Sequence, residues 1–277
     1  MASDRLSTEE LTPVKICVLV KSVPEAGVTK RINPSTGRLE RGGETRDNPF
    51  DTHAIEAAMQ LKEGGALQVD EIVAVTMGPD AAAKALRKAV SLGADRSIHL
   101  SDEALAGSDV NGTGYALAKV LAAESPDLVL LGQQSDDGEC YTIGAVVADH
   151  LEMPSLTQVI QIDVEGGALK CERQAEYGYD TVSLPLPAVI SVGDAINEPR
   201  YPSLKAIMGA KKKPLDTKAT GDVSIEADKV GESGSRTTVL ELKAPPEKQA
   251  GEIIEDEDTN ETVEKIVNWL DERKLLA

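Results

Sequence analysis

Short apolar runs alternate with amphipathic stretches through the first half of the chain. The runs lie at 15–20, 71–76, 97–100 and 127–131, and each is typical of a strand buried on both faces of a sheet. Helix-start signals follow three of these runs: Asn48-Pro49, Gly78-Pro79 and Asp109. A fourth amphipathic stretch ends near Leu151. Strands that alternate with helices predict right-handed crossovers and therefore an α/β fold with a doubly wound parallel sheet.

The pattern changes after Pro154. Four extended runs follow without a helix between them, at 158–164, 168–174, 179–184 and 188–192. Consecutive strands without a crossover helix commonly pair antiparallel, so the sequence predicts a small antiparallel excursion. Residues 193–245 hold few apolar positions and are expected to be loop and linker. Near the end, an apolar stripe at helical spacing predicts a C-terminal helix: Val263, Ile266, Val267 and Leu270.

These patterns divide the chain into three expected parts. An N-terminal tail covers 1–14, the α/β domain covers 15–213, and a linker with a C-terminal arm covers 214–277. Inside the domain, Gly and Pro residues interrupt 21–47, which is expected to form a long loop or an irregular hairpin.

Composition narrows the class of protein. Aromatic residues make up only 3% of the chain, so the core must be built from Ala, Val, Leu and Ile, as in parallel sheets covered by helices. Lys plus Arg number 29 against 47 Asp plus Glu, which gives a net charge of −18. Phosphate repels a chain this acidic, so nucleic acid is not an expected partner.

The cysteines and the hydropathy of the chain indicate where in the cell the protein is expected. Cys17, Cys140 and Cys171 are isolated in the sequence, which favours buried free thiols over a disulfide framework or a zinc site. No apolar run reaches the roughly 18–20 residues that span a bilayer, and the first residues lack a signal-peptide core. We therefore expect a soluble cytoplasmic protein that does not insert into a membrane.

The loop Gln133–Glu139 is the first candidate site. It follows a buried strand and precedes a helix, at the edge of an open α/β sheet where ligands bind. Unpaired N–H groups near Cys140 to Thr142 would hold phosphate, and Gly138 would let the backbone approach it. The alternative is an ordinary capped strand–helix loop, and the loop alone does not decide between them. Residues 76–79, at another strand end, would close a nucleotide slot, although a structural turn is the simpler interpretation of that stretch.

A second candidate is the stiff segment from Asn197 to Leu204. Pro199 and Pro202 restrict it, and basic residues surround it in an otherwise acidic chain: Arg200, Lys205, Lys211, Lys212 and Lys213. An apolar residue on a stiff, basic loop suits docking on a partner protein. The alternative is a solvated loop whose apolar residues tuck beneath it.

Catalytic motifs are absent from the sequence. It contains no Gly-x-Ser-x-Gly, no HExxH and no Walker loop, and His53, His99 and His150 lie far apart along it. Nothing organises a nucleophile or a general base, so we expect no catalytic residues, no metal ligands and a role other than that of an enzyme.

Several motifs in fixed order resemble those of electron-transfer flavoprotein β subunits. The similarity covers 15–213 and is strongest from Leu186 to Lys213. The matching stretches upstream are 18–24, 48–51, 77–79, 92–96 and 131–138. The resemblance implies a β subunit that pairs with an α subunit, completes the FAD site of that subunit, and itself holds AMP or a second FAD. It also implies docking on an acyl-CoA dehydrogenase-type flavoprotein, with a quinone oxidoreductase as a further candidate partner.

The same resemblance assigns site residues. Phe50 would lie near the flavin of the α subunit, and Leu204 would anchor a recognition loop at 197–209. The implied nucleotide contacts are Leu19, Asn48, Pro49, Phe50, Asp51, Met77, Gly132, Gln133, Gln134, Ser135, Asp136, Asp137, Gly138, Glu139, Cys140, Tyr141, Thr142 and Ile143. The implied partner contacts are Arg200, Tyr201, Pro202, Ser203, Leu204, Lys205, Ile207 and Met208.

Departures from the family pattern leave undecided whether the nucleotide is FAD or AMP. Electron-bifurcating members continue the Asp-Gly pair with Asp-Thr-Ala-Gln-Val-Gly-Pro, whereas this chain has Glu139 to Ala145 with a bulky Tyr141, which counts against FAD. The stretch 251–254 resembles bifurcating members and counts for it, and the balance places FAD ahead of AMP. The rival interpretation is a stand-alone nucleotide-binding regulator of the universal-stress type, which shares the sheet architecture.

Overall fold

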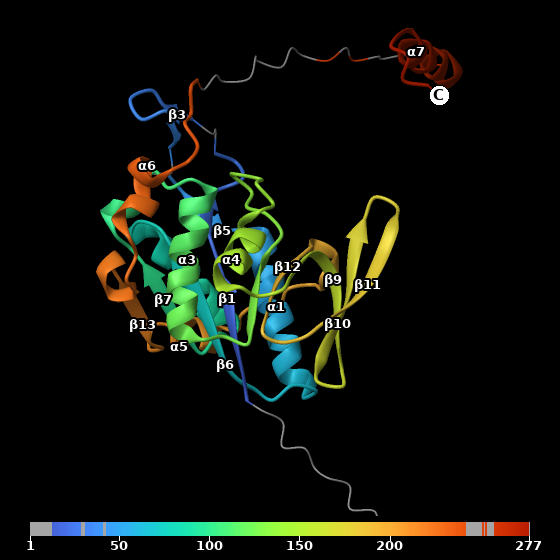
Figure 1. Ribbon diagram of the computed structural model, residues 1–277. Helices are drawn as coiled ribbons and strands as arrows, with labels where there is room; N and C mark the ends of the chain where they lie inside the picture. The colour runs from blue at the N-terminus through green and yellow to red at the C-terminus, as the bar shows by residue number, and fades with distance from the viewer. Residues whose placement is uncertain are drawn as a thin grey trace, which may run out of the picture. The chain divides into compact units, whose positions relative to one another are not determined.

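The computed structural model describes residues 13–28, 31–40, 43–241, 251, 253 and 258–276. The chain divides into two compact units, Met1–Leu240 and Glu241–Ala277. The first is built on a nine-stranded sheet in the order β11-β10-β9-β12-β8-β1-β6-β7-β13 (Figure 1). The central parallel strands are β1 (Val14–Leu19), β6 (Val69–Met77), β7 (Arg96–Leu100) and β8 (Leu128–Gly132). The predicted doubly wound α/β fold is confirmed.

Helices cover both faces of the sheet. They are α1 (Pro49–Gly64), α2 (Ala83–Leu92), α3 (Val110–Glu124) and α4 (Ile143–Leu151). Side chains of β1 alternate between two cores: Ile16 and Val18 pack with α1 and α2, whereas Cys17 and Leu19 pack with α3 and α4. Figure 1 shows α3 and α4 together on the near side of the sheet. Burial on both faces explains why these strands are continuous apolar runs in the sequence.

The predicted antiparallel excursion comprises three strands instead of four. β9 (Ser155–Glu165), β10 (Ala168–Ala175) and β11 (Gly178–Leu184) form an antiparallel meander at one edge of the sheet. β12 (Ala188–Val192) instead pairs parallel with both β8 and β9, so its predicted antiparallel pairing is wrong. Every residue of β12 is buried, as expected for an interior parallel strand.

The predicted linker at 193–245 is also wrong in part. Helix α5 (Leu204–Ala210) and strand β13 (Leu215–Lys218) follow each other there, and β13 pairs parallel with β7 as the last strand of the sheet. Beyond β13, Val223 and Val230 are buried in the core beneath α3. An edge strand is held by main-chain hydrogen bonds and has few buried side chains, so its hydrophobic pattern is weak. The first compact unit consequently extends past residue 213 to Leu240.

The described residues of the stretch 21–47, namely 21–28, 31–40 and 43–47, form the expected irregular hairpin. Strand β2 (Ser22–Pro24) pairs with β5 (Thr45–Asp47), and β3 (Ile32–Asn33) pairs with β4 (Arg38–Leu39). Among the described residues, no helix is both long and apolar enough to cross a bilayer. Of the three free cysteines, Cys17 and Cys171 are buried as expected, but Cys140 is exposed.

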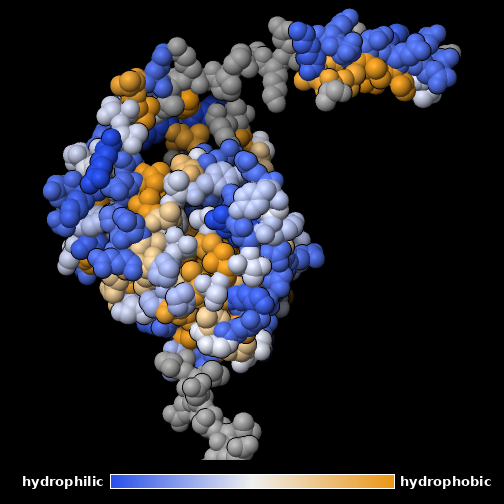
Figure 2. All heavy atoms as spheres, turned by 45° about the vertical axis from the view of Figure 1, so that its right-hand side comes forward, coloured by the Kyte–Doolittle hydropathy of each residue, from blue (hydrophilic) through white to orange (hydrophobic). Residues whose placement is uncertain are grey.

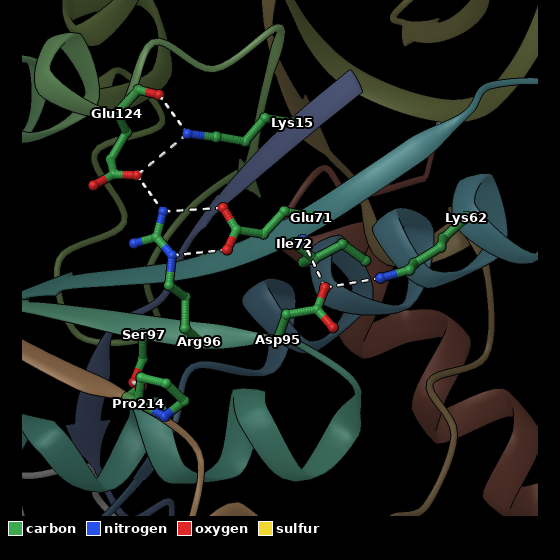
Figure 3. Close-up of polar contacts among 9 residues, drawn as sticks. All are labelled: Lys15, Lys62, Glu71, Ile72, Asp95, Arg96, Ser97, Glu124 and Pro214. Carbon is green, nitrogen blue, oxygen red and sulfur yellow. Dashed lines mark hydrogen bonds and ion pairs between the residues drawn. The ribbon is translucent and has the colours of Figure 1, made fainter. Parts of the chain in front are cut away.

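Charged side chains join the amino ends of three central strands (Figure 3). Arg96 of β7 donates to both carboxylate oxygens of Glu71 on β6, at 2.8 and 3.0 Å. Arg96 also pairs with Glu124 at the end of α3, whose carbonyl accepts from Lys15 Nζ of β1 at 2.9 Å. The charges at the amino ends of these strands therefore pair with one another. A cavity lies at the opposite, carboxyl ends of the strands.

The second unit contains the predicted C-terminal helix, α7 (Thr259–Glu272). Asp258 begins it and accepts a hydrogen bond from Asn260 N at 2.8 Å. Figure 2 shows apolar side chains gathered on one side of α7, and Val263, Ile266, Val267 and Trp269 are all exposed. Most of the predicted N-terminal tail, and Glu252, Ile254 and 255–257 of the bifurcating-type stretch, lie outside the described residues.

Candidate functional site

A cavity of about 1270 Å³ opens at the carboxyl ends of β1, β6 and β8, on the side of α3 and α4. Its inner wall is apolar and includes Leu19, Val75, Met77, Leu117 and Leu131. Strand β1 lies between β6 and β8. The chain continues from β1 to α1 on one face of the sheet and from β8 to α4 on the other face. The cavity therefore occupies the point where open α/β sheets bind ligands.

Most of the predicted nucleotide residues line this cavity. Those that do are Leu19, Asn48, Asp51, Met77, Gly132, Gln133, Gln134, Ser135, Gly138, Cys140, Tyr141, Thr142 and Ile143. Five predicted residues are not part of the lining: Pro49, Phe50, Asp136, Asp137 and Glu139. Gly78 and Pro79 also line it, so the structure brings together the two loops that sequence analysis proposed as sides of one slot.

Asp51 joins two strand ends beneath the cavity. Its carboxylate accepts from Lys21 N at 2.8 Å and from Gly132 N at 3.1 Å, and it is buried in the first turn of α1. Burial is the largest influence on this group and raises the pKa of Asp51 to about 7, although the hydrogen bonds oppose it. Asp51 thus positions the ends of β1 and β8 from within the cavity wall.

Asn48 fixes the loop that follows β8. Its side-chain amide donates to Gln134 O at 2.8 Å, and its side-chain oxygen accepts from Asp136 N at 3.1 Å. The residue occupies the N-cap position of α1, as predicted, but its side chain makes no capping hydrogen bond. Its polar atoms are used to hold the loop instead.

Two basic side chains that sequence analysis did not assign to the site hold the acidic loop. Lys21 Nζ donates to Asp137 Oδ1 at 2.6 Å and to Ser135 Oγ at 3.1 Å. Arg46 Nη2 donates to Asp136 Oδ2 at 2.5 Å. These ion pairs offset the negative charge of Asp136 and Asp137 at the rim of the cavity. No local sequence signal marked these two residues, because their partners lie far away along the chain.

Gly132 is required by a close approach of helix α1. A methyl group at this position would lie 2.5 Å from Phe50 Cβ and 2.7 Å from Asp51 Oδ1. Non-bonded carbon atoms pack at about 3.5–4.0 Å, so only glycine fits here without movement of α1. Phe50, expected near the flavin of the α subunit, thus packs against the end of β8.

The helix after the loop begins later than predicted. α4 starts at Ile143, with Thr142 as its N-cap, so the unpaired N–H groups belong to Ile143 and the residues after it. Glu139 and Tyr141 adopt left-handed backbone conformations, with φ of 46° and 56°, and delay the first helical turn. Tyr141 lies on the cavity wall with nearly half of its side chain exposed.

The residues of the site fit an adenine nucleotide. Gln134 Oε1 is buried without a hydrogen-bond partner among the described residues, which leaves an acceptor for a ligand donor or a water molecule. The apolar wall suits a flat base, and the start of α4 offers backbone donors to a phosphate. The far wall, at 101–110 before α3, was not predicted because nothing in its sequence distinguishes it from an ordinary loop.

The predicted docking segment lies apart from the cavity and contributes no residue to its lining. Tyr201, Leu204 and Met208 are 94%, 74% and 65% exposed, and Ile207 and Lys205 are also exposed. Ser203 caps α5 by accepting from Ala206 N at 3.2 Å. Arg200 is instead paired with Glu56 and Glu63 of α1, and Pro202 is half-buried.

Comparisons with known proteins agree with this architecture. A family model described as Electron transfer flavoprotein domain matches residues 36–222. The chain is 39% identical over 267 residues to the electron transfer flavoprotein subunit beta of Mycobacterium tuberculosis (strain ATCC 25618 / H37Rv), covering 94% of this chain and 99% of that one. It is 36% identical over 248 residues to the Bos taurus protein of the same name, covering 88% and 94%. It is 34% identical over 265 residues to the caffeyl-CoA reductase-Etf complex subunit CarD of Acetobacterium woodii, covering 95% and 100%.

These matches span the α/β domain and the segment with the exposed leucine, and they extend over nearly the whole length of each relative. They decide against the universal-stress-type regulator, which is a different family. The resemblance inferred from the ordered motifs is confirmed. The chain therefore belongs to the beta subunits of electron transfer flavoproteins and is an electron carrier subunit.

Proposed function

We propose that this chain binds an adenine nucleotide in the cavity at the ends of β1, β6 and β8, and pairs with an electron-transfer flavoprotein α subunit whose FAD site it completes. The observation that carries the proposal is the cavity itself, with its apolar wall and the ordered loop at 132–139. A bound flavin supplies the electron-carrying chemistry. The chain's own residues bind, orient and shield it, and we assign no proton transfer to them.

The size of the cavity supports FAD ahead of AMP. Its volume of about 1270 Å³ exceeds the about 300–1,000 Å³ typical of small-molecule pockets. The ion pairs of Lys21 and Arg46 reduce the repulsion that the acidic loop would exert on a diphosphate. Tyr141 was expected to count against FAD by its bulk, but its side chain is nearly half exposed, so this objection is weaker.

The nucleotide is identified by denaturing the purified heterodimer and analysing what is released. After reconstitution with excess FAD, a ratio near two flavins per heterodimer is expected. A ratio fixed near one, with AMP in the released material, would show that this subunit holds AMP. A colourless preparation that contains neither nucleotide would contradict the proposal as a whole.

We further propose that α5 docks on an acyl-CoA dehydrogenase-type flavoprotein, with a quinone oxidoreductase as a candidate acceptor. Its exposed Leu204 and Met208 support this, because isolated apolar side chains in a basic surround suit a partner pocket. A cytoplasmic location is proposed with it, and the two buried free thiols, Cys17 and Cys171, support a reducing compartment.

A further inference from the structure

One arginine joins the docking segment to helix α1. Arg200 donates from Nε to Glu56 Oε2 at 2.6 Å and from Nη2 to Glu56 Oε1 at 2.9 Å. It also donates from Nη1 and Nη2 to the two carboxylate oxygens of Glu63, at 2.6 and 2.9 Å. Two bidentate pairs occupy two edges of the guanidinium, so little of it is left for a carboxylate on another protein.

The two glutamates lie on one face of α1, two helical turns apart. The side chain of Glu56 is only 7% exposed, whereas that of Glu63 is 54% exposed. A buried carboxylate needs its charge compensated, and Arg200 supplies the opposite charge to Glu56. The hydrogen bond from Arg200 also holds the pKa of Glu63 below its usual value, despite the exposure of Glu63.

Asn197, three residues before Arg200, forms a second attachment to α1. Its partner is His53, which lies about one helical turn before Glu56. His53 Nδ1 lies 3.0 Å from Asn197 O, and Asn197 Nδ2 donates to His53 O at 3.0 Å. The segment from Asn197 to Arg200 is therefore bonded to α1 at both of its ends. Pro202 then restricts the backbone between this attachment and α5.

Helix α5 cannot fix its own orientation. It has seven residues, none of which is buried, and a helix this short is marginal without tertiary contacts. It lies beside α2, and at its far end Lys213 Nζ donates to Ala94 O at 2.7 Å. The direction in which Leu204 points therefore depends on the attachments at the two ends of α5 together with its contact with α2.

We propose that Arg200 is a positioning residue, which orients the apolar face of α5 through Glu56 and Glu63 and does not itself bind the partner. The inference rests on the proposed docking function of α5. A segment held in advance loses less conformational freedom when its partner binds, so the affinity is higher for the same contacts.

Glu63→Gln separates positioning from direct contact, because the two roles predict opposite outcomes. We measure the KM of an acyl-CoA dehydrogenase for the complete αβ heterodimer. If Arg200 positions α5, Glu63→Gln raises this KM about two- to fivefold, since one exposed ion pair is lost. If Arg200 contacts the partner directly, Glu63→Gln frees the guanidinium, and the KM stays unchanged or falls. Either of these last results would overturn the proposal.

A matched pair of charge removals gives a second readout. Arg200→Gln and Lys205→Gln each remove one positive charge, but Lys205 lies on α5 itself. Arg200→Gln is expected to raise the KM about tenfold, and the increase should persist at about 0.5 M salt, where direct charge contacts are screened. An increase that disappears at high salt, as expected for Lys205→Gln, would assign Arg200 a direct contact instead.

Leu204→Ala distinguishes failure of this inference from failure of the docking function. If Leu204→Ala leaves the KM unchanged, α5 is not the docking element, and both proposals fall. If Leu204→Ala raises the KM but Glu63→Gln does not, only the positioning role of Arg200 is refuted. The flavin content and the thermal unfolding of each variant separate a loss of docking from a folding defect. If Arg200→Gln folds poorly, Glu63→Gln still tests the proposal, because Glu63 is exposed.

Discussion

The side-chain ammonium of Lys21 lies 2.6 Å from a carboxylate oxygen of Asp137, and this contact joins the end of β1 to the loop that follows β8. The side chain of Asp137 is only 1% exposed, whereas that of Lys21 is 41% exposed. The same ammonium donates to Ser135 Oγ at 3.1 Å. The shape of the acidic loop is therefore set partly by the charge of a residue that lies far away in the sequence, just after β1.

Replacing Lys21 with Gln should weaken both the fold and nucleotide retention. We expect the free energy of unfolding to fall by about 1–3 kcal/mol, because a hydrogen bond to a charged and buried partner is lost. Urea unfolding and the nucleotide content of the purified heterodimer measure the two effects. Lys170→Gln, which removes the exposed pair with Glu165 at 2.9 Å, is the matched control and should lower the stability clearly less than Lys21→Gln, because solvent screens an exposed pair. Equal losses in the two variants would count against the role of Lys21.

Adding one methyl group at Gly132 should push helix α1 away from β8. Because that group would lie 2.5 Å from Phe50 Cβ, we expect Gly132→Ala to lower the free energy of unfolding by about 1–3 kcal/mol. Gly64→Ala is the control, since nothing lies within 4 Å of a methyl group there. Denaturant unfolding that gives both variants the same midpoint would refute the close approach.

The carboxyl of Asp51 should make stability depend on pH. Burial raises its pKa from 3.8 to about 7, so the native state binds a proton that the unfolded state releases between those values. The contribution of Asp51 to the free energy of unfolding therefore falls as pH rises from about 4 to about 7, by at most about 4 kcal/mol, and is constant above. Urea unfolding of the parent and of Asp51→Asn across this range measures it. A difference between the two curves that does not change with pH would contradict the raised pKa.

Truncating Leu204, the exposed leucine of α5, should slow electron delivery. A leucine that enters a partner pocket contributes roughly 1.5–3 kcal/mol, so Leu204→Ala should slow reduction by the dehydrogenase about tenfold below saturation. Val239→Ala is the control, an aliphatic residue that is 64% exposed outside the docking segment. Stopped-flow reduction of the bound flavin reports both rates, and identical rates would remove Leu204 from the docking surface.

Removing residues 251–277 should weaken assembly with the α subunit. Helix α7 exposes Val263, Ile266, Val267 and Trp269 on itself, and an amphipathic helix gains stability by burying such a face. We expect the truncated chain to form the heterodimer with at least about tenfold lower affinity, as the loss of one well-buried anchor commonly causes. Analytical ultracentrifugation compares it with the full chain. Unchanged affinity would assign α7 to another role.

Residues that start or end a helix predicted the limits of α1 from the sequence alone. Asn48 and Pro49 begin α1 and Gly65 ends it with a φ of 68°, a conformation that glycine adopts readily. The direction of β12 was missed because it depends on where the chain re-enters the sheet, between β8 and β9, which no local pattern records. Strand β13 was missed because backbone pairing at an edge leaves little hydrophobic periodicity.

The candidate site was predictable in its loops but not in its charges. Gln133 to Gly138 follow a buried strand, and that position alone predicts a place at the carboxyl edge of the sheet. Lys21 and Arg46 were not assigned to it because an ion pair between distant segments leaves no periodic trace. The start of α4 was placed too early because the left-handed conformations of Glu139 and Tyr141 are uncommon for such residues.

The length of helix α1 is fixed by what it contacts along its axis. Asp51, in its first turn, bonds to the ends of β1 and β8, while Glu56 and Glu63 bond to Arg200. Inserting one residue between Asp51 and Glu56 would rotate the second part of the helix by about 100° and shift it by about 1.5 Å. Both glutamates would then face away from Arg200 while Asp51 kept its place. The length of α1 thus sets the distance between the cavity and the segment with the exposed leucine. The helix should tolerate substitutions on its outer face far better than any change in length.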